Sequence, residues 1–424
     1  MQSDEFITDL LDFIESSPTS YHAVERMTSI LSARGFRRLD ERHRWQLEPG
    51  RYFVVREGSL IGFVLDQDPS QGLRMAGAHT DSPGLKIKPN PVRIQDNYLQ
   101  LTAEIYGSPL LSTWLDRELS LAGRVIRQQD DGTLHCSLVD LRKPVALIPS
   151  LAIHLQDKEQ KDINRQTALV PILQTWNDST CPSLSALLSG RDGEQHSSGE
   201  LLAFDLFCYD CRPPLIAGLD RSFVSGPRLD NLLSCHALVR ALSEGTLRGS
   251  CLVSWYDHEE VGSGSGSGAS STFLPDVLAR IIPEAEERSM AMQRSVFISV
   301  DNAHGLHPNY PAAHDSQHRP VLNRGVVIKI NANQRYATSG WTSALFRQIA
   351  RHCEVDVQEF VMPNDKGCGS TIGPLLSRLL GVKTVDVGVP TLGMHSIREL
   401  AGLDDCWSLY RCLQHYFQGE VPLP

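Results

Sequence analysis

The sequence predicts an α/β protein in which a mainly parallel sheet is flanked by helices and interrupted by an inserted β-rich second domain. Short apolar segments alternate with helical signals, as in buried parallel sheets; they lie at 73–79, 251–256, 295–300, 326–330 and 384–389. Between residues 92 and 225 the pattern becomes strand-like, and Asp131-Gly132 marks a hairpin turn. We therefore expect one discontinuous domain, 1–91 with 226–424, and an inserted domain, 92–225.

Helices are expected from capping signals and apolar periodicity at 21–34, 229–244, 272–287, 341–353, 371–380 and 404–417. Ser20 and Gly35 supply the start and stop signals of the first. The N-terminal segment forms a further amphipathic helix with Ser3 as its expected N-cap. Its apolar face consists of Phe6, Ile7, Leu10, Leu11 and Ile14.

The composition is that of an ordinary globular protein, with 424 residues, 41% hydrophobic and 21% charged. The net charge of −10 argues against general nucleic-acid binding, which needs a basic face. No apolar run approaches the ~18 residues of a membrane span, and the acidic N-terminus is unlike a signal peptide. The ten cysteines are scattered, which indicates reduced thiols and a cytoplasmic protein. The lone CxxC of Cys208 and Cys211 is interpreted as two ordinary thiols.

The first candidate for chemistry is the pair His79 and Asp81, which follows an apolar strand. Residues i and i+2 of a strand share a face, so Asp81 can orient the imidazole of a metal-binding His79. A hydrogen-bonded pair at a strand end, without metal, is the alternative.

The second candidate is the adjacent pair Glu259 and Glu260 after the apolar run 251–255. Two carboxylates at the end of a buried strand are costly unless a cation or a function compensates them. Glu260 is the natural metal ligand and Glu259 the general base for a water molecule. A solvated acidic turn is the alternative for the pair, and a flexible linker for the glycine-rich tract that follows.

Three further candidates follow from their places at strand or helix ends: Asp230, Asp301 and His395. Open α/β sheets place their sites at the carboxyl ends of the strands. With His79 and Glu260 they give a common count for two metal ions: one bridging carboxylate, with one histidine and one carboxylate on each ion. Nitrogen and oxygen ligands favour zinc, with manganese or cobalt as substitutes.

Several longer strings occur in order along the chain: GAHTDSPGLKIKP, SGPRLDNLLSC, DHEEVGSGSGSGA, HPNYPAAHD, NDKGCGSTIGP and MHSIRELAG. In these strings the sequence resembles the M18 family of metalloaminopeptidases, the aspartyl aminopeptidase family, and most of all its bacterial members. The resemblance implies a two-zinc peptidase fold and Asp230 as the bridging ligand. It implies that His79 and Asp301 complete one zinc site and Glu260 and His395 the other, with Glu259 as base and Asp81 as support for His79. From related two-metal peptidases we also expect a cis peptide bond between Asp230 and Asn231.

The resemblance also implies substrate contacts at His304, Lys329 and Tyr336, and we expect the charge of Lys329 to favour acidic first residues. It implies that the inserted domain serves in dimerisation or as a lid, and that its His154 reaches the active site of a neighbouring subunit. The expected partners are peptides and further copies of the chain, in a dimer-based dodecamer, with no nucleic acid and no membrane.

Some positions depart from the family pattern, namely the SGSGSGA tract, YGSP at 106–109, His258 and Lys366. They leave the ligands and the base in place, so they bear on substrate preference. Two other functions stay open. A carboxypeptidase or deacylase with the same site would need an arginine in the pocket, such as Arg228 or Arg335. A non-catalytic oligomeric binding protein would retain the fold without turnover.

Overall fold

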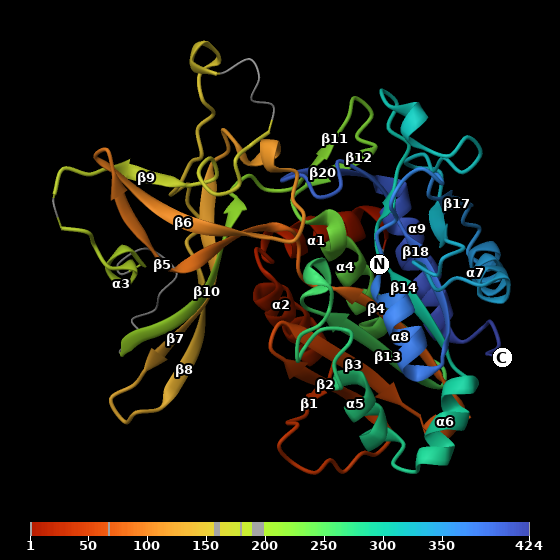
Figure 1. Cartoon of the computed structure of the whole chain (residues 1–424). Helices are drawn as coiled ribbons and strands as arrows, with labels where there is room; N and C mark the ends of the chain where they lie inside the picture. The colour runs from red at the N-terminus through yellow and green to blue at the C-terminus, as the bar shows by residue number, and fades with distance from the viewer. Residues whose placement is uncertain (1, 67, 157–161, 179, 189–198, 424) are drawn as a thin grey trace. The chain divides into compact units, whose positions relative to one another are not determined.

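The computed structural model in Figure 1 describes residues 2–66, 68–156, 162–178, 180–188 and 199–423. Its internal contacts divide the chain into two compact units. The first unit comprises Met1–Asp81, Pro214–Met394 and Glu399–Pro424. The second comprises Ser82–Pro213 and His395–Arg398. The chain thus leaves the first unit once for a long insertion and once for a short loop.

The first unit is built on a nine-stranded mixed sheet (Figure 1). In spatial order its strands are β1 (Arg37–Arg38), β2 (Gly50–Arg56), β3 (Ser59–Leu65), β13 (Ser250–Tyr256), β4 (Leu73–His79), β14 (Val296–Val300), β18 (Lys383–Gly388), β16 (Val326–Ile330) and β17 (Val357–Val361). The four central strands, β13, β4, β14 and β18, are parallel. Strands β3 and β16 join them antiparallel. The predicted α/β fold with a parallel-centred sheet is confirmed.

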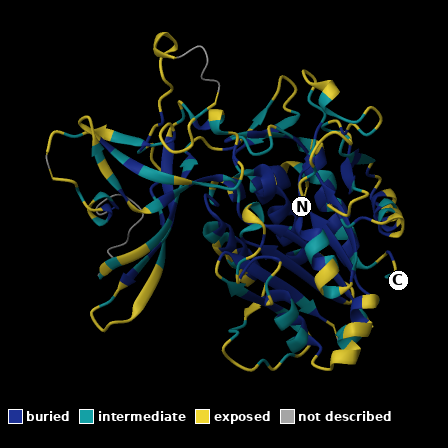
Figure 2. Ribbon diagram, viewed as in Figure 1, coloured by how far each residue is buried: buried dark blue, intermediate teal, exposed yellow. Residues whose placement is uncertain are grey.

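Helices pack on both faces of this sheet and bury its alternating apolar side chains. One core contains α1 (Ser3–Glu15), α2 (Ser20–Ala33), α4 (Leu229–Ser243), α7 (Gly340–His352) and α9 (Leu403–Gln418). The other contains α5 (Phe273–Ile281), α6 (Ala285–Gln293) and α8 (Ile372–Leu380). Along β13, Val253 points into the first core and Leu252 into the second, which is the period of a strand buried on both faces. Figure 2 shows these strands as buried.

Three details of the helices differ from expectation. The single helix expected at 272–287 is two helices, because Pro283 lacks an N–H and forces Ile282 out of helical geometry. The N-cap of α1 is Gln2, not Ser3, and the Gln2 N–H donates to the Glu5 carboxylate. On that helix Phe13 is buried where Leu11 was expected, and Leu11 is only partly buried.

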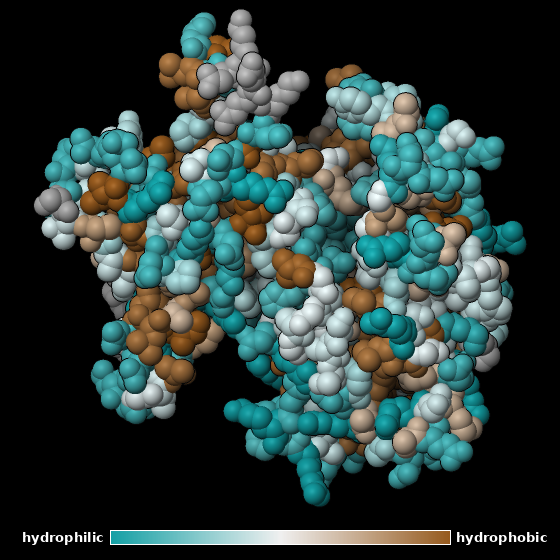
Figure 3. All heavy atoms as spheres, in the orientation of Figure 1, coloured by the Kyte–Doolittle hydropathy of each residue, from teal (hydrophilic) through white to brown (hydrophobic). Residues whose placement is uncertain are grey.

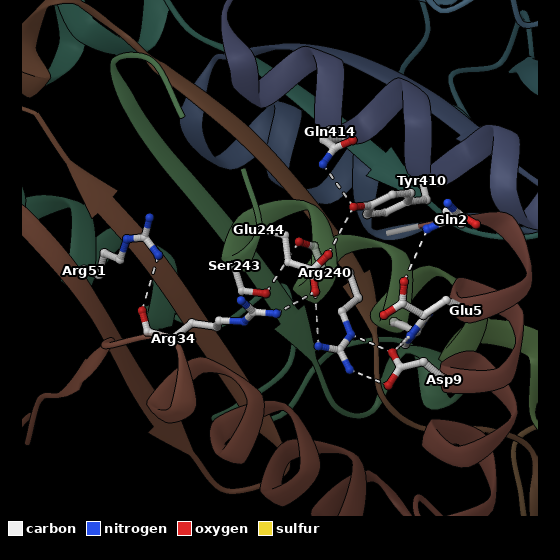
Figure 4. A network of polar contacts seen from close by, with 11 residues as sticks. Gln2, Glu5, Asp9, Arg34, Arg51, Arg240, Ser243, Glu244, Tyr410 and Gln414 are labelled. Atoms are coloured by element: carbon white, nitrogen blue, oxygen red, sulfur yellow. Dashed lines mark hydrogen bonds and ion pairs between the residues drawn. The ribbon is translucent and has the colours of Figure 1, made fainter. Parts of the chain in front are cut away.

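Helix α1 is fixed to α4 by a charged cluster as well as by apolar packing (Figure 4). The Arg240 guanidinium donates to both carboxylate oxygens of Asp9, at 2.6 Å from Nε to Oδ2. The ring Nε2 of the fully buried His236 lies 2.5 Å from the same Oδ2. Burial opposes the ionisation of Asp9, but these two partners outweigh it and lower its pKa. Asp9 is therefore an ionised anchor between the two helices.

A smaller sheet completes the first unit. Its strands, in order, are β11 (Leu215–Ala217), β12 (Phe223–Gly226), β20 (Glu399–Gly402), β19 (Pro390–Leu392) and β15 (Ala303–His304). It contains the segment just before α4 and the segment just after β14, so it borders the candidate site.

The second unit is a six-stranded antiparallel sheet with a short helix, α3 (Leu184–Leu188). The strand order is β8 (Leu134–Asp140), β7 (Leu119–Gln128), β10 (Glu200–Asp210), β5 (Gly84–Gln95), β6 (Tyr98–Tyr106) and β9 (Ile172–Thr175). The hairpin turn at Asp131-Gly132 joins β7 to β8, and Gly132 has a φ of 81° that suits glycine. Burial raises the pKa of Cys208 to about 12, which agrees with an unreactive thiol.

The surface of this unit mixes polar and apolar side chains, and hydrophobic atoms are visible on the face drawn in Figure 3. Exposed apolar residues include Leu151, Ile153 and Leu155. Within the described part of the chain, no helix has the length and hydrophobicity needed to cross a membrane.

Candidate metal and catalytic site

The candidate residues of the first unit meet at the carboxyl ends of its parallel strands. His79 is the last residue of β4, Asp301 follows β14, and the Glu259–Glu260 pair follows β13. Because β13, β4 and β14 are adjacent and parallel, their ends lie at one edge of the sheet. Asp230 joins them from the first turn of α4.

Imidazole and carboxylate atoms lie close together there. The Nε2 atom of His79 is 3.3 Å from Oδ1 of Asp230 and 3.6 Å from Oδ1 of Asp301. His79, Asp230 and Glu260 each offer a ligand atom, and these atoms all lie within 4.8 Å of one another. The side chains of His79 and Asp230 are 2% and 5% exposed. One nitrogen and several oxygen atoms that can bind a metal ion therefore lie around a space of the size that such an ion needs.

Asp81 connects His79 to the two glutamates. The Nδ1 atom of His79 lies 3.0 Å from the backbone carbonyl oxygen of Asp81 and 3.5 Å from its carboxylate. The two carboxylate oxygens of Asp81 accept the backbone N–H groups of Glu259 and Glu260, each at 3.1 Å. From the sequence we expected only that Asp81 contacts the imidazole of His79. Asp81 therefore orients the imidazole and also fixes the turn that carries both glutamates.

The turn that carries Glu259 and Glu260 leaves the strand sharply, and the glycine-rich tract behind it is anchored. The turn is a 3₁₀ segment, Glu259–Val261, bounded by left-handed residues His258 (φ 66°) and Gly262 (φ 96°). Nδ1 of His258 lies 2.8 Å from Oγ of Ser265. Ser59 Oγ donates to the Ser267 carbonyl at 2.8 Å. The glycine-rich tract is therefore a loop held by hydrogen bonds, and not the flexible linker that was the alternative interpretation of its sequence.

The electrostatics of the site are those of buried negative charge. Burial, together with Asp301, Asp81 and Asp230, raises the pKa of Glu259 to about 8. Burial and Asp230 also raise the pKa of Glu260 well above its usual value. Burial alone would lower the pKa of His79, but the carboxylates of Asp230, Asp301 and Asp81 raise it well above its usual value. The carboxylates thus repel one another, and a bound cation would compensate them.

The residues present fit zinc by their chemistry and spacing. Imidazole nitrogen and carboxylate oxygen are zinc ligands, and thiolates are not needed for a site that also binds substrate. The thiol of Cys235 donates a hydrogen bond to the His79 carbonyl oxygen at 2.9 Å, and burial raises its pKa. It therefore supports the backbone of His79 as a neutral group.

The start of α4 is held in place by residues that the sequence did not single out. The Asp230–Asn231 peptide bond is cis, as expected. The Asp230 N–H donates to the Glu399 carboxylate at 2.8 Å, and the Asn231 side chain donates to the Val300 carbonyl oxygen at 2.8 Å. Glu399 lies in the MHSIREL string, four residues after His395, which is the one signal that could have drawn attention to it.

The expected substrate contacts of the first unit lie around Phe360, next to Asp301. The His304 and Tyr336 rings have centroids 5.4 and 6.5 Å from that of Phe360. Nζ of Lys329 lies 5.2 Å from the centroid of the Tyr336 ring and 3.4 Å from Oδ2 of Asp301, and it donates to the Asn302 carbonyl oxygen. Burial opposes the ionisation of Asp301, but Lys329 and His79 outweigh it and keep its pKa low.

Two predicted site residues belong to the second unit. His395 has a left-handed backbone (φ 66°), and its Nδ1 lies 3.1 Å from the Ser108 carbonyl oxygen. His154 is exposed in a short 3₁₀ turn, Ile153–Leu155. The roles of both histidines at the metal site stay predictions.

The two arginines that could have served a carboxypeptidase have other contacts. Arg228 donates to the carbonyl oxygens of Ser17 and Ile14, at 3.1 and 3.2 Å, between α1 and α2. Arg335 is exposed and donates to the Cys368 carbonyl oxygen at 3.0 Å.

Comparison with known proteins places this site in context. Residues 13–417 match the family model described as aminopeptidase I zinc metalloprotease (M18). A protein of Stutzerimonas stutzeri named probable M18 family aminopeptidase 2 is 46% identical over 428 residues, covering 99% of this chain and 100% of the relative.

Solved structures resemble the whole chain. Ape4, solved in complex with Nbr1, superposes with a TM-score of 0.95 at 36% identity, covering 98% of this chain and 86% of that one. The S. cerevisiae mApe1 dodecamer has a TM-score of 0.81 at 26% identity, covering 98% of this chain and 97% of that one.

Proposed function

Because the chain belongs to the M18 family and is a zinc-dependent aminopeptidase, we propose that it removes the first residue of peptides at a site of two bridged zinc ions. The observation that carries the proposal is the cluster of His79, Asp230 and Glu260, whose ligand atoms lie within 4.8 Å of one another. Asp301 lies at its side, 3.6 Å from His79. Asp230 would bridge the ions, with His79 and Asp301 on one and Glu260 and His395 on the other. Manganese or cobalt could replace zinc.

The reaction follows from the placement of the remaining groups. When bound, the ions supply Lewis acidity toward the scissile carbonyl. Glu259 takes a proton from the attacking water and delivers it to the leaving amine. Asp81 holds the Glu259 turn through its backbone N–H. The free amino group of the substrate would bind beside the metal–carboxylate cluster, which would restrict cleavage to the first residue.

The experiment that tests this function pairs metal analysis with a panel of peptides. Purified protein is analysed for zinc and assayed on peptides with free and with acetylated N-termini, and on acylated amino acids. We expect close to two zinc ions per chain and hydrolysis of the free peptides only. Cleavage of blocked peptides from their C-termini would favour a carboxypeptidase, and cleavage of acylated amino acids a deacylase. A zinc-loaded protein without turnover would favour a binding role.

We propose further that Lys329 gives a preference for acidic first residues, by charge complementarity. Its ammonium nitrogen lies at the site, 3.4 Å from Oδ2 of Asp301. Lys329→Ala should lower kcat/KM for Asp- and Glu-initiated peptides relative to Leu-initiated ones by about 10–100-fold, the effect of one hydrogen bond to a charged group. Lys383→Ala removes a lysine of the same unit at the start of β18, the strand end away from the site, and serves as control. An unchanged preference in Lys329→Ala would refute this role.

The protein is also proposed to act as a large homo-oligomer, dimer-based and dodecameric, with His154 completing a neighbouring active site. The support is the dodecamer of the related mApe1 and the exposure of His154 on this chain. Its exposed neighbours Ile153 and Leu155 are of the kind that subunit contacts cover.

A further inference from the structure

Asp386 is a fully buried carboxylate beside the candidate site that takes no part in the chemistry above. It lies on the central strand β18 and is 0% exposed. Its Oδ1 accepts the Thr371 hydroxyl at 2.5 Å, and its Oδ2 accepts the Ala337 N–H at 2.6 Å. Its own N–H donates to the Thr338 hydroxyl at 2.9 Å. One side chain thus joins β18 to the segment that contains Tyr336 and to the start of α8.

Lys329 lies on the same face of the sheet, next to Asp386. In the antiparallel pair of β16 and β18, Val327 is opposite Gly388 and Ile328 is opposite Val387. The same register, continued by one residue, places Lys329 opposite Asp386. Residues in that relation share a face, with Cβ atoms about 4.5–5.5 Å apart. Burial raises the pKa of Asp386, and the positive charge of Lys329 opposes that rise.

Two carboxylates therefore act on Lys329: Asp301 in an ion pair, and Asp386 through its charge without a direct contact. Asp301, the expected metal ligand, lies 3.4 Å from its Nζ. A carboxylate that holds a metal ion shares its charge with that ion, which leaves Asp386 as the counter-charge of the buried ammonium. The Tyr336 ring, 5.2 Å from Nζ, is the third neighbour of this group.

The carboxylate of Asp386 fits tightly against the first turn of α8. A Cβ added to Gly373 would lie 2.5 Å from Oδ1 and 2.6 Å from Oδ2 of Asp386. The N-terminus of a helix favours a negative charge, so α8 and Thr371 hold the carboxylate in one position. The fixed carboxylate of Asp386 can therefore fix the positions of the groups that it contacts.

We propose that Asp386 is a positioning residue for the pocket that receives the first residue of the substrate. It holds Lys329 by its charge and holds the Tyr336 segment through the Ala337 N–H. This inference rests on the proposed function, because it takes Lys329 and Tyr336 as contacts of that first residue.

The test uses two variants of the zinc-loaded enzyme. Asp386→Asn keeps the shape and an acceptor for Ala337 but removes the charge that faces Lys329. Thr371→Val keeps that charge and removes one hydrogen bond. For Asp386→Asn we expect the ratio of kcat/KM between Glu- and Leu-initiated peptides to change about tenfold, and through KM, because Lys329 loses a nearby opposite charge. Thr371→Val should change the ratio less.

A purely structural role would lower Tm and reduce turnover of both peptides equally, leaving their ratio and KM values as in the wild type. That outcome in Asp386→Asn overturns the inference, whichever first residue the wild type prefers. If the wild type cleaves no peptide, the proposed function fails, and a crystal structure of Asp386→Asn decides the inference alone. Unchanged positions of Lys329 Nζ and the Tyr336 ring would then overturn it, and displacement of either would support it.

Discussion

Glu259 lies in a turn whose backbone N–H donates to the Asp81 carboxylate. Gly262 ends this turn in a left-handed conformation. Replacing the Glu259 carboxylate by an amide, which cannot take up a proton, should therefore leave the turn and the expected metal ligands in place. Glu259→Gln is expected to lower kcat roughly 10²–10⁴-fold while zinc content stays that of the wild type. Turnover and bound zinc measured on the same preparation check this.

Glu260→Gln is the matched comparison, because it changes the neighbouring expected ligand and should reduce zinc content as well as turnover. Near-normal turnover in Glu259→Gln would remove Glu259 from the role of base. Loss of zinc in that variant would instead make it a ligand.

For single residues, the sequence predicts which polar side chains lie at strand ends, but it does not predict which residues of other strands they contact. His79, Asp301 and the glutamate pair could be predicted because each follows an apolar run. The position of Asp386 opposite Lys329 could not, because it depends on β16 joining β18 antiparallel, which no local pattern reveals. The contact of Asp81 with two backbone N–H groups depends likewise on β13 lying next to β4.

Among the elements, α1 is the one whose attachment is most easily tested. Asp9 is ionised between Arg240 and the buried His236, so Asp9→Asn leaves a partly buried guanidinium without its main partner. We expect unfolding at pH 7 to become easier by about 2–3 kcal/mol. Asp12→Asn changes an exposed carboxylate of the same helix and should alter stability by less than about 0.5 kcal/mol.

The pH dependence of this difference follows from the sign of the shift. The folded pKa of Asp9 lies below its ordinary value of 3.8, so its contribution is present above that pH and is lost as the pH falls below it. The difference in stability between wild type and Asp9→Asn should begin to shrink as the pH falls below about 4 and should vanish only when the pH passes the lowered folded pKa, as measured by denaturant unfolding. A difference that is as large at pH 3 as at pH 7 would show that packing, and not the charge, stabilises the contact.

Element boundaries were predicted where the chain carries a clear stop. Gly381 ends α8 with a φ of 65°, and the end expected at residue 380 was right. The break between α5 and α6 was missed although Pro283, which cannot donate a helical hydrogen bond, lies inside the predicted helix. The two-residue strands β1 and β15 have no sequence signal, since they exist only by pairing with a neighbour.

For the whole molecule, the proposed exchange of His154 between subunits has a direct test. His154→Ala and Glu259→Gln homo-oligomers should each be nearly inactive if every active site needs both groups. Oligomers that contain both variants should regain activity, because some sites then combine an intact Glu259 with an intact His154 from a neighbour. Co-expression with two different tags, followed by tandem purification and assay, measures this. No recovery in mixed oligomers of normal size would show that His154 does not act across subunits.

The order of the strands in the large sheet has a consequence for biosynthesis. The cluster draws on residues 79, 230, 260 and 301, and β18, which lies between β14 and β16, ends at Gly388. A growing chain exposes its N-terminal strands first, so β4 has both of its neighbours, β13 and β14, only after residue 300 has been made. We therefore expect the cluster to assemble late in translation. A nascent chain that ends before Asp301 lacks part of the cluster, so we expect it to have no peptidase activity.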